Sequence, residues 1–207
     1  MTVLFKAFSA LLSYPTEEMR AALPEITEVV RTSRLVAPRE RDALLALIDE
    51  IGRGDQLAAE ERYVDLFDRG RALSLHLFEH LHGESRDRGS AMVELKQLYG
   101  AASYELTASE LPDYLPVVLE YLSLRSLAEA REMLADCAHI LRSITRSLIG
   151  RESRYAAVLQ ALLVIAGESP VDASRVKAMK ERHEALDRDW FERPAFDEPA
   201  PSSRPVP

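Results

Sequence analysis

The spacing of apolar residues predicts helices along the first third of the chain. Apolar positions recur at i, i+3 and i+4 in segments 3–12, 38–52 and 55–67, as on the buried face of an amphipathic helix. Thr16 and Asp55 stand where helix N-caps are expected, and Pro24 is expected to break or kink the helix that Thr16 starts. No stretch keeps the two-residue alternation of a strand. The pattern therefore predicts an all-α fold.

The second half of the chain continues this pattern and then loses it. Spacings of three and four, typical of a packed seam between helices, join Leu134, Cys137, Leu141, Ile144 and Leu148. Segment 155–166 is apolar nearly all round, which predicts a buried final helix. Apolar residues thin out from Gly167, and segment 195–207 is rich in proline. We predict a single-domain helical bundle of about eight to ten helices over residues 1–170. Residues 171–207 are predicted to form a weakly structured to disordered tail.

Charge and composition narrow the classes of partner. The 207 residues include 34 acidic and 26 basic side chains, for a net charge of −8, which argues against nonspecific binding to nucleic acid or an anionic membrane and favours a basic partner. The single cysteine excludes an internal disulfide and fits a reducing cytoplasm. No segment reaches the roughly 20 apolar residues of a membrane span. The N-terminus lacks the features of a signal peptide, so we expect a cytoplasmic protein.

Segment 73–89 holds the densest group of reactive side chains. At about 100° per residue, a helix through its first half puts apolar residues on one arc and three polar ones, His76, Glu79 and His80, on the other. These three match H-x-x-E-H, the inverted zinc-peptidase pattern in which two histidines bind the metal and the glutamate acts as base. A zinc hydrolase also needs a third ligand, and no downstream segment provides an obvious one. We therefore favour a polar helix face over a metal site for these residues.

Other enzyme signals are weak. Cys137 and His139 are two positions apart, so on one helix they would point to different sides, and the spacing of Cys137 places it in the core. The chain has no glycine-rich phosphate loop, Walker pattern or G-x-S-x-G elbow. We therefore predict neither catalysis nor a bound cofactor.

Segment 110–124 predicts a second functional surface. Two prolines near a helix start lead into a helix whose core face carries Leu115 and Leu119. The opposite stripe mixes carboxylates with apolar residues, and it comprises Asp113, Val117, Glu120 and Leu124. Together with the charge run at 84–88, this stripe is interpreted as a groove wall for recognition.

These two segments carry a resemblance to a known family. LFEHLHGESRDRG at 77–89 with AMV at 91–93, and ELPDYLP at 110–116 with LEYL at 119–122, closely resemble the respiratory nitrate reductase assembly chaperones, also called delta chains. Matches at 12–15, 63–68 and 186–196 extend the resemblance over most of the chain. Tyr114 stands where these chaperones commonly carry histidine, which puts a proton-carrying role of that ring in doubt.

The resemblance implies a function. It implies a non-catalytic, all-helical cytoplasmic chaperone of the wider family serving molybdoenzymes of the dimethyl sulfoxide reductase type. Such a protein would bind the N-terminal peptide of the apo nitrate reductase catalytic (alpha) subunit and keep it competent for molybdenum cofactor insertion and membrane assembly. It would be absent from the finished enzyme, and cofactor-delivery proteins are a further class of partner. The alternatives are the zinc hydrolase and a helical adaptor for another partner.

The predicted peptide-binding surface combines the charged and aromatic residues that remain once core faces are assigned. Its members are Tyr63, Phe67, His80, His82, Glu84, Arg86, Asp87, Arg88, Glu110, Pro112, Asp113, Tyr114, Pro116, Val117, Glu120 and Tyr121.

Overall fold

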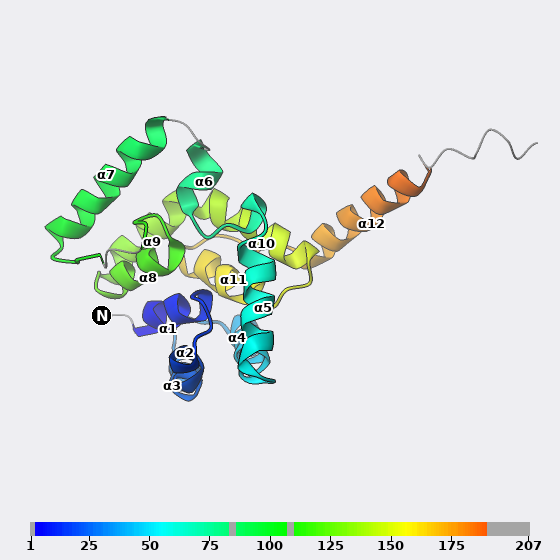
Figure 1. Cartoon of the computed structure of the whole chain (residues 1–207), viewed down its shortest axis with the longest axis horizontal. Helices are drawn as coiled ribbons and strands as arrows, with labels where there is room; N and C mark the ends of the chain where they lie inside the picture. Colours follow the sequence, from blue (N-terminus) through cyan, green and yellow to red (C-terminus); the bar gives the residue numbers. More distant parts are fainter. Residues whose placement is uncertain (1–2, 83–85, 107–109, 190–207) are drawn as a thin grey trace, which may run out of the picture. The chain divides into compact units, whose positions relative to one another are not determined.

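The computed structural model confirms the all-α prediction. It describes residues 3–82, 86–106 and 110–189, and the side chains of 82, 86, 87 and 183–189 lie outside that description. The described residues form twelve α-helices and one short 3-10 helix, without a strand (Figure 1). Twelve exceeds the eight to ten expected because prolines and short connectors divide several predicted helices.

The first five helices follow local sequence signals. The Thr16 side chain accepts a hydrogen bond from the Met19 N–H, and Asp55 accepts one from the Ala58 N–H, so both predicted caps are confirmed. The helix that Thr16 starts ends before Pro24, which lies in the first turn of the next one. These helices are α1 (Val3–Leu12), α2 (Glu17–Ala21), α3 (Leu23–Thr32), α4 (Pro38–Gly52) and α5 (Gln56–Phe67).

The middle of the chain departs from the predicted continuous helix through residues 73–82. The 3-10 helix η1 (Arg71–Leu73) is followed by extended backbone, and α6 (Leu77–His82) begins only after it. The reason is a backbone bridge, the antiparallel pairing of residues 75–77 with 113–115. Within it the Leu115 N–H donates to the Leu75 carbonyl at 2.8 Å, and the Leu77 N–H donates to the Asp113 carbonyl at 3.0 Å. Helices α7 (Arg86–Ala101) and α8 (Leu115–Ser123) follow.

Apolar faces of helices from both halves of the chain form the core. Helix α1 packs along α8, and α10 packs against α11. The seam residues Leu134, Leu141, Ile144 and Leu148 have no exposed surface, and each such side chain contributes about 1.5–3 kcal/mol when buried. The predicted seam is interrupted at Cys137, which lies at the junction of two helices. These last helices are α9 (Leu127–Asp136), α10 (Ala138–Gly150) and α11 (Ala156–Ile165).

The chain divides into two compact units, Met1–Val171 and Asp172–Pro207. Helix α11 was predicted to be the final helix, but α12 (Ala173–Asp189) follows in the second unit. It starts after Asp172, whose carboxylate accepts from the Ser174 N–H at 2.9 Å. The disorder predicted for 195–207 falls outside the described residues. Among the helices that the structure describes, none combines the length and apolarity that crossing a membrane requires.

Candidate functional site

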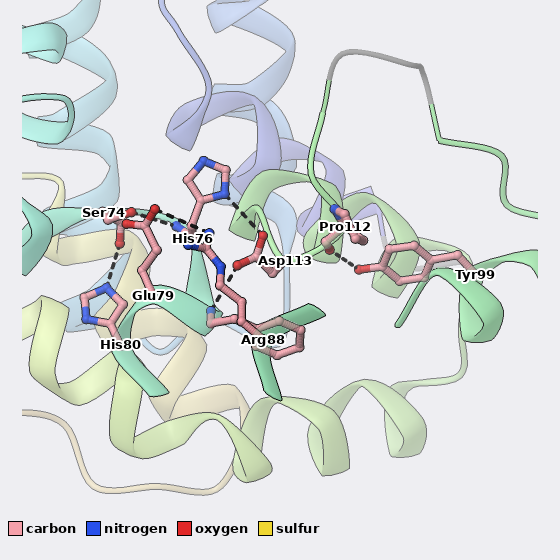
Figure 2. A network of polar contacts seen from close by, with 9 residues as sticks. Ser74, His76, Glu79, His80, Arg88, Tyr99, Pro112 and Asp113 are labelled. Atoms are coloured by element: carbon pink, nitrogen blue, oxygen red, sulfur yellow. Dashed lines mark hydrogen bonds and ion pairs between the residues drawn. The ribbon is translucent and has the colours of Figure 1, made fainter. Parts of the chain in front are cut away.

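Asp113 fastens the loop before α8 to the start of α6. Its carboxylate has no exposed surface, accepts a hydrogen bond from the Phe78 N–H at 3.0 Å, and lies 3.3 Å from Nδ1 of His76 (Figure 2). A carboxylate from a distant segment thus satisfies an N–H group at the start of α6. The prediction that Asp113 lines a groove wall is therefore wrong, because Asp113 precedes α8 and the helical rotation used to place it does not apply.

Tyr99 fastens the same loop to the end of α7. Its ring is 1% exposed, and its hydroxyl donates to the Pro112 carbonyl at 2.8 Å (Figure 2). Burial raises the pKa of Tyr99, so the phenol remains a neutral donor at neutral pH. The loop at 110–114 is consequently attached to both the α6 start and the α7 end.

A chain of hydroxyl groups connects this loop to the core. The Tyr63 hydroxyl donates to the Leu12 carbonyl at 2.8 Å and lies 3.0 Å from the Tyr114 hydroxyl. Since Tyr63 has one proton to give, Tyr114 is the donor in the second bond. The His76 ring stacks on Tyr114, with centroids 5.1 Å apart. Tyr114 is therefore held on one side by a core tyrosine and on the other by the histidine that Asp113 orients.

A pocket of about 230 Å³ lies beside the start of α8, and we call it the acidic pocket. It is lined by Ser9, Ser13, Tyr104, Glu105, Leu106, Glu110, Tyr114, Pro116, Val117 and Glu120. Three of these residues are carboxylates that are exposed, and none of the described lining residues is basic. The Tyr104 hydroxyl donates to Glu120 Oε2 at 2.9 Å, while Pro116 and Val117 are buried. The pocket suits a cationic group attached to an apolar one.

A larger pocket of about 560 Å³ lies beside η1 and α6, and we call it the mixed-charge pocket. It is lined by Phe67, Asp68, Arg69, Gly70, Arg71, Ser74, His76, Glu79 and Arg88. Most of its charges already have partners. Arg88 lies 3.4 Å from the Glu79 carboxylate, and Arg71 donates to the Glu79 backbone carbonyl at 2.9 Å. Its polar groups mainly hold α6 and α7 in place.

The H-x-x-E-H residues do not form the arrangement of a zinc site. His76 precedes α6 and faces Asp113, whereas Nε2 of His80 lies 2.9 Å from the Ser74 carbonyl (Figure 2). A carbonyl only accepts, so Nε2 of His80 carries a proton and is not available to a metal. Within residues 3–82, 86–106 and 110–189, no group of three or more His, Cys, Asp or Glu side chains is placed to hold a metal ion.

Cys137 and His139 do not form a nucleophile pair. The half-buried Cys137 thiol donates to the Leu134 carbonyl at 3.5 Å. Burial raises its pKa to about 12, so at neutral pH it stays a thiol. His139 is exposed on α10.

The predicted surface residues separate into groups. The acidic pocket brings together Glu110, Tyr114, Pro116, Val117 and Glu120. The mixed-charge pocket contains Phe67 and Arg88, and His80 lies near it on α6. Neither pocket is lined by Tyr63, Pro112, Asp113 or Tyr121, and these four are buried, which corrects the expectation of exposure. The pocket residues Phe67, Pro116 and Val117 are buried as well. Predictions for Glu84 and for the side chains of His82, Arg86 and Asp87 lie outside the described residues.

Sequence reasoning missed several residues of the site. Tyr104 and Glu105 line the acidic pocket, and His76 orients Tyr114, yet none was assigned to the peptide surface. Tyr104 lies in the connector after α7, where helical periodicity does not predict the direction in which a side chain points. His76 did carry a signal, its place in the H-x-x-E-H pattern, but that pattern was considered only as a zinc site or a polar helix face.

Comparison with known proteins gives consistent matches. Residues 15–159 match the family model described as nitrate reductase delta subunit. The chain is 40% identical over 190 residues to NarJ of Escherichia coli K12, named as a nitrate reductase molybdenum cofactor assembly chaperone, with 89% of this chain and 80% of that protein covered. NarW of the same organism, a probable chaperone of this kind by name, is 35% identical over 91% of this chain and 81% of its own. The corresponding probable NarJ of Bacillus subtilis is 33% identical over 78% of this chain and 86% of its own.

Proposed function

The chain belongs to the nitrate reductase delta subunit family, and we propose that it is a system-specific chaperone for respiratory nitrate reductase. In this proposal it binds the N-terminal segment of the apo catalytic subunit and keeps that subunit competent for molybdenum cofactor insertion and membrane assembly. It then leaves, and it catalyses no reaction. The names of the relatives, which are assembly chaperones or probable ones, support the chaperone role.

The acidic pocket is the observation that carries the binding part of the proposal. Its exposed carboxylates Glu105, Glu110 and Glu120 surround a floor that includes Pro116 and Val117. A basic amphipathic segment complements both features, since apolar side chains cover the floor and lysine or arginine side chains meet the rim. Opposite charge also sets the orientation and the encounter rate of the partner. The net charge of −8 adds attraction at longer range.

The placement of the carboxylates also suits release. An exposed ion pair contributes roughly 0–1 kcal/mol, so three of them orient a partner without making binding irreversible. A pocket of about 230 Å³ buries one or two side chains. An assembly chaperone has to let its client go, and this combination of a small apolar floor and an exposed charged rim supports that behaviour.

Calorimetry can test the proposal with a peptide spanning the N-terminal segment of the cognate nitrate reductase catalytic subunit. We expect Glu105→Lys combined with Glu110→Lys to weaken binding about tenfold or more, because two attractions become repulsions. The matched control reverses two exposed carboxylates on α9, Glu132→Lys with Asp136→Lys. The control carries the same change in net charge and should bind within about twofold of the wild type.

Two outcomes would contradict the proposal in different ways. Equal affinities of the pocket variant and the α9 control would show that binding occurs elsewhere on the chain. Failure of the peptide to bind the folded wild-type protein would remove the client assignment, and the alternative of a helical adaptor for another partner would then be favoured.

A further inference from the structure

Tyr155 has a buried ring, and its hydroxyl has no hydrogen-bond partner among the described residues. Its side chain is 6% exposed and its ring packs edge-on against Tyr63 and Phe67, but its hydroxyl makes no hydrogen bond to any described residue. The hydroxyl oxygen is not fully buried, because it is not among the buried side-chain atoms of the described residues that lack a partner, so water or a ligand in the slot can accept its hydrogen bond. Burial and the nearby Glu50 raise the pKa of Tyr155, while the nearby Arg62 opposes the shift, so the phenol keeps its proton and remains a donor.

The Tyr155 ring lines a slot of about 210 Å³ with an apolar floor between α4, α5 and the start of α11. Ile51, Ala59 and Leu66 contribute to this floor. Glu50 and Arg62 line the slot and also an adjoining pocket of about 330 Å³, so the two spaces share one rim. The site therefore joins an apolar floor, one hydroxyl donor and a charged rim.

The rim carries an excess of positive charge. Arg53, Arg62 and Arg154 stand against Asp49 and Glu50, three positive groups against two negative ones. Arg53 pairs with Asp49, and Arg154 lies 3.0 Å from Glu50. Arg62 has no carboxylate partner among the described residues. The exposed Arg62 guanidinium of this rim is thus free to pair with an anion, and a single negative charge would balance the rim.

We propose that this site binds a monoanionic carboxylate carried on an apolar group. Arg62 pairs with the carboxylate, the Tyr155 hydroxyl donates to one of its oxygens, and the apolar group fills the slot. Guanidinium groups favour planar oxyanions, and the charge balance favours a carboxylate over a dianionic phosphate. The carboxylate comes from a free organic acid or from an acidic residue of a polypeptide. The site is separate from the acidic pocket and does not depend on the proposed chaperone function.

The full chain can be titrated by NMR with three probes. Phenylacetate represents the free acid, an N-acetylated and amidated Leu-Asp dipeptide represents the polypeptide source, and inorganic phosphate tests selectivity. We expect phenylacetate or the dipeptide to shift the amide signals of Ser153 and Tyr155, with the tighter of the two identifying the source. Phosphate should shift them less. An absence of saturable shifts with both carboxylates would overturn the proposal, and so would equal binding of phosphate.

Two variants test the named contacts. Tyr155→Phe keeps the ring and removes only the unpaired hydroxyl, so it should leave folding stability unchanged or slightly higher while weakening carboxylate binding about fivefold. Arg62→Gln should weaken it up to about fivefold, because the ion pair of an exposed guanidinium is lost. Arg39→Gln, which changes an exposed arginine of α4, is the matched control, and this variant should bind as the wild type does. Unchanged affinity in both Tyr155→Phe and Arg62→Gln would overturn the assignment.

Discussion

The α1–α8 pair and the α6–α7 hairpin are held in place by different kinds of contact. Between α1 and α8 the contact is apolar, and Phe5, Phe8 and Leu119 are among its fully buried side chains. In α7, by contrast, Tyr99 alone is buried among the side chains that the structure describes, and Val93 is 56% exposed. A few polar bonds, from Asp113 and from Tyr99, attach this hairpin to the rest of its unit (Figure 2).

This difference implies that the α1–α8 contact supplies stability, whereas the α6–α7 hairpin can move locally. A core of close-packed apolar side chains resists any local change, because each displaced group leaves a cavity. A hairpin with few buried apolar contacts opens at a lower free energy than the core, as partial unfolding in other proteins indicates. The loop at 110–114 that borders the acidic pocket belongs to the second kind. We therefore expect the acidic pocket, the proposed client site, to be adjustable while the core remains folded.

The largest effect is expected in the core. Phe8→Ala should lower the free energy of unfolding by about 3–5 kcal/mol, because a fully buried ring is lost between α1 and α8. Urea denaturation followed by circular dichroism measures this change. Lys6→Ala, on the exposed side of α1, is the control and should change the free energy by about 0.5 kcal/mol or less. A loss near 1 kcal/mol for Phe8→Ala would mean that the α1–α8 contact is less rigid than the structure shows.

A smaller and more local effect is expected at the attachment of the hairpin. Asp113→Ala leaves the Phe78 N–H and the His76 ring without their acceptor, at a cost of roughly 1–3 kcal/mol. Hydrogen exchange should then accelerate at Phe78 while the amides of α10 and α11 stay protected.

Two observations can refute this local interpretation of Asp113. Equal acceleration in α10 and α11 would show that the hairpin and the core unfold as one unit. The exposed Asp136→Ala, at the end of α9, is the control for loss of a carboxylate, and an equal acceleration at Phe78 in that variant would point to charge alone.

Features set within one helix could be predicted from the sequence, whereas contacts between distant segments could not. Helix α4 begins at Pro38 and ends at Gly52 as predicted, and Thr16 and Asp55 cap their helices, because breakers and caps act within one helical turn. In α8 the predicted mixed stripe contains Val117 and Glu120, which both line the acidic pocket, although Val117 is buried and Glu120 is exposed. Rotation along a regular helix thus grouped two residues that lie at one pocket, but it did not predict which of them is exposed.

The attachment of the hairpin could not be predicted in this way. His76 and Asp113 are 37 positions apart, and no local pattern announces that their segments pair. Because of this pairing, α6 begins only at Leu77, His76 lies outside it, and Asp113 is buried. A prediction from helical rotation therefore misplaced both His76 and Asp113. Tertiary hydrogen bonds overrode a local helical preference here. The family resemblance singled out these two segments but carried no information on which of their residues are buried.

The smallest expected effect is a pH dependence of the hairpin that passes through His76. The hydrogen bond with Asp113 is the largest influence on the imidazole, and it raises the pKa of His76, while burial lowers it. The negative charges of Asp113 and Glu79 raise this pKa further, and the positive charge of Arg88 lowers it, so the net shift is upward. A raised pKa in the folded state means that protonation favours folding. This stabilisation is fully present below the unfolded value of about 6.5 and is lost as the pH rises through the folded value.

His76→Gln removes this contribution and can be compared with the wild type at pH 6 and pH 8. The free energy of opening at the Phe78 amide, corrected for the intrinsic exchange rate, should be higher in the wild type at pH 6, and the difference should shrink at pH 8. His139→Gln, an exposed histidine on α10, should show no such pH-dependent difference. A difference between wild type and His76→Gln that grows with pH would contradict this prediction, because neutral His76 would then be the stabilising form. In that case the uncharged imidazole would stabilise the hairpin by donating a hydrogen bond to Asp113.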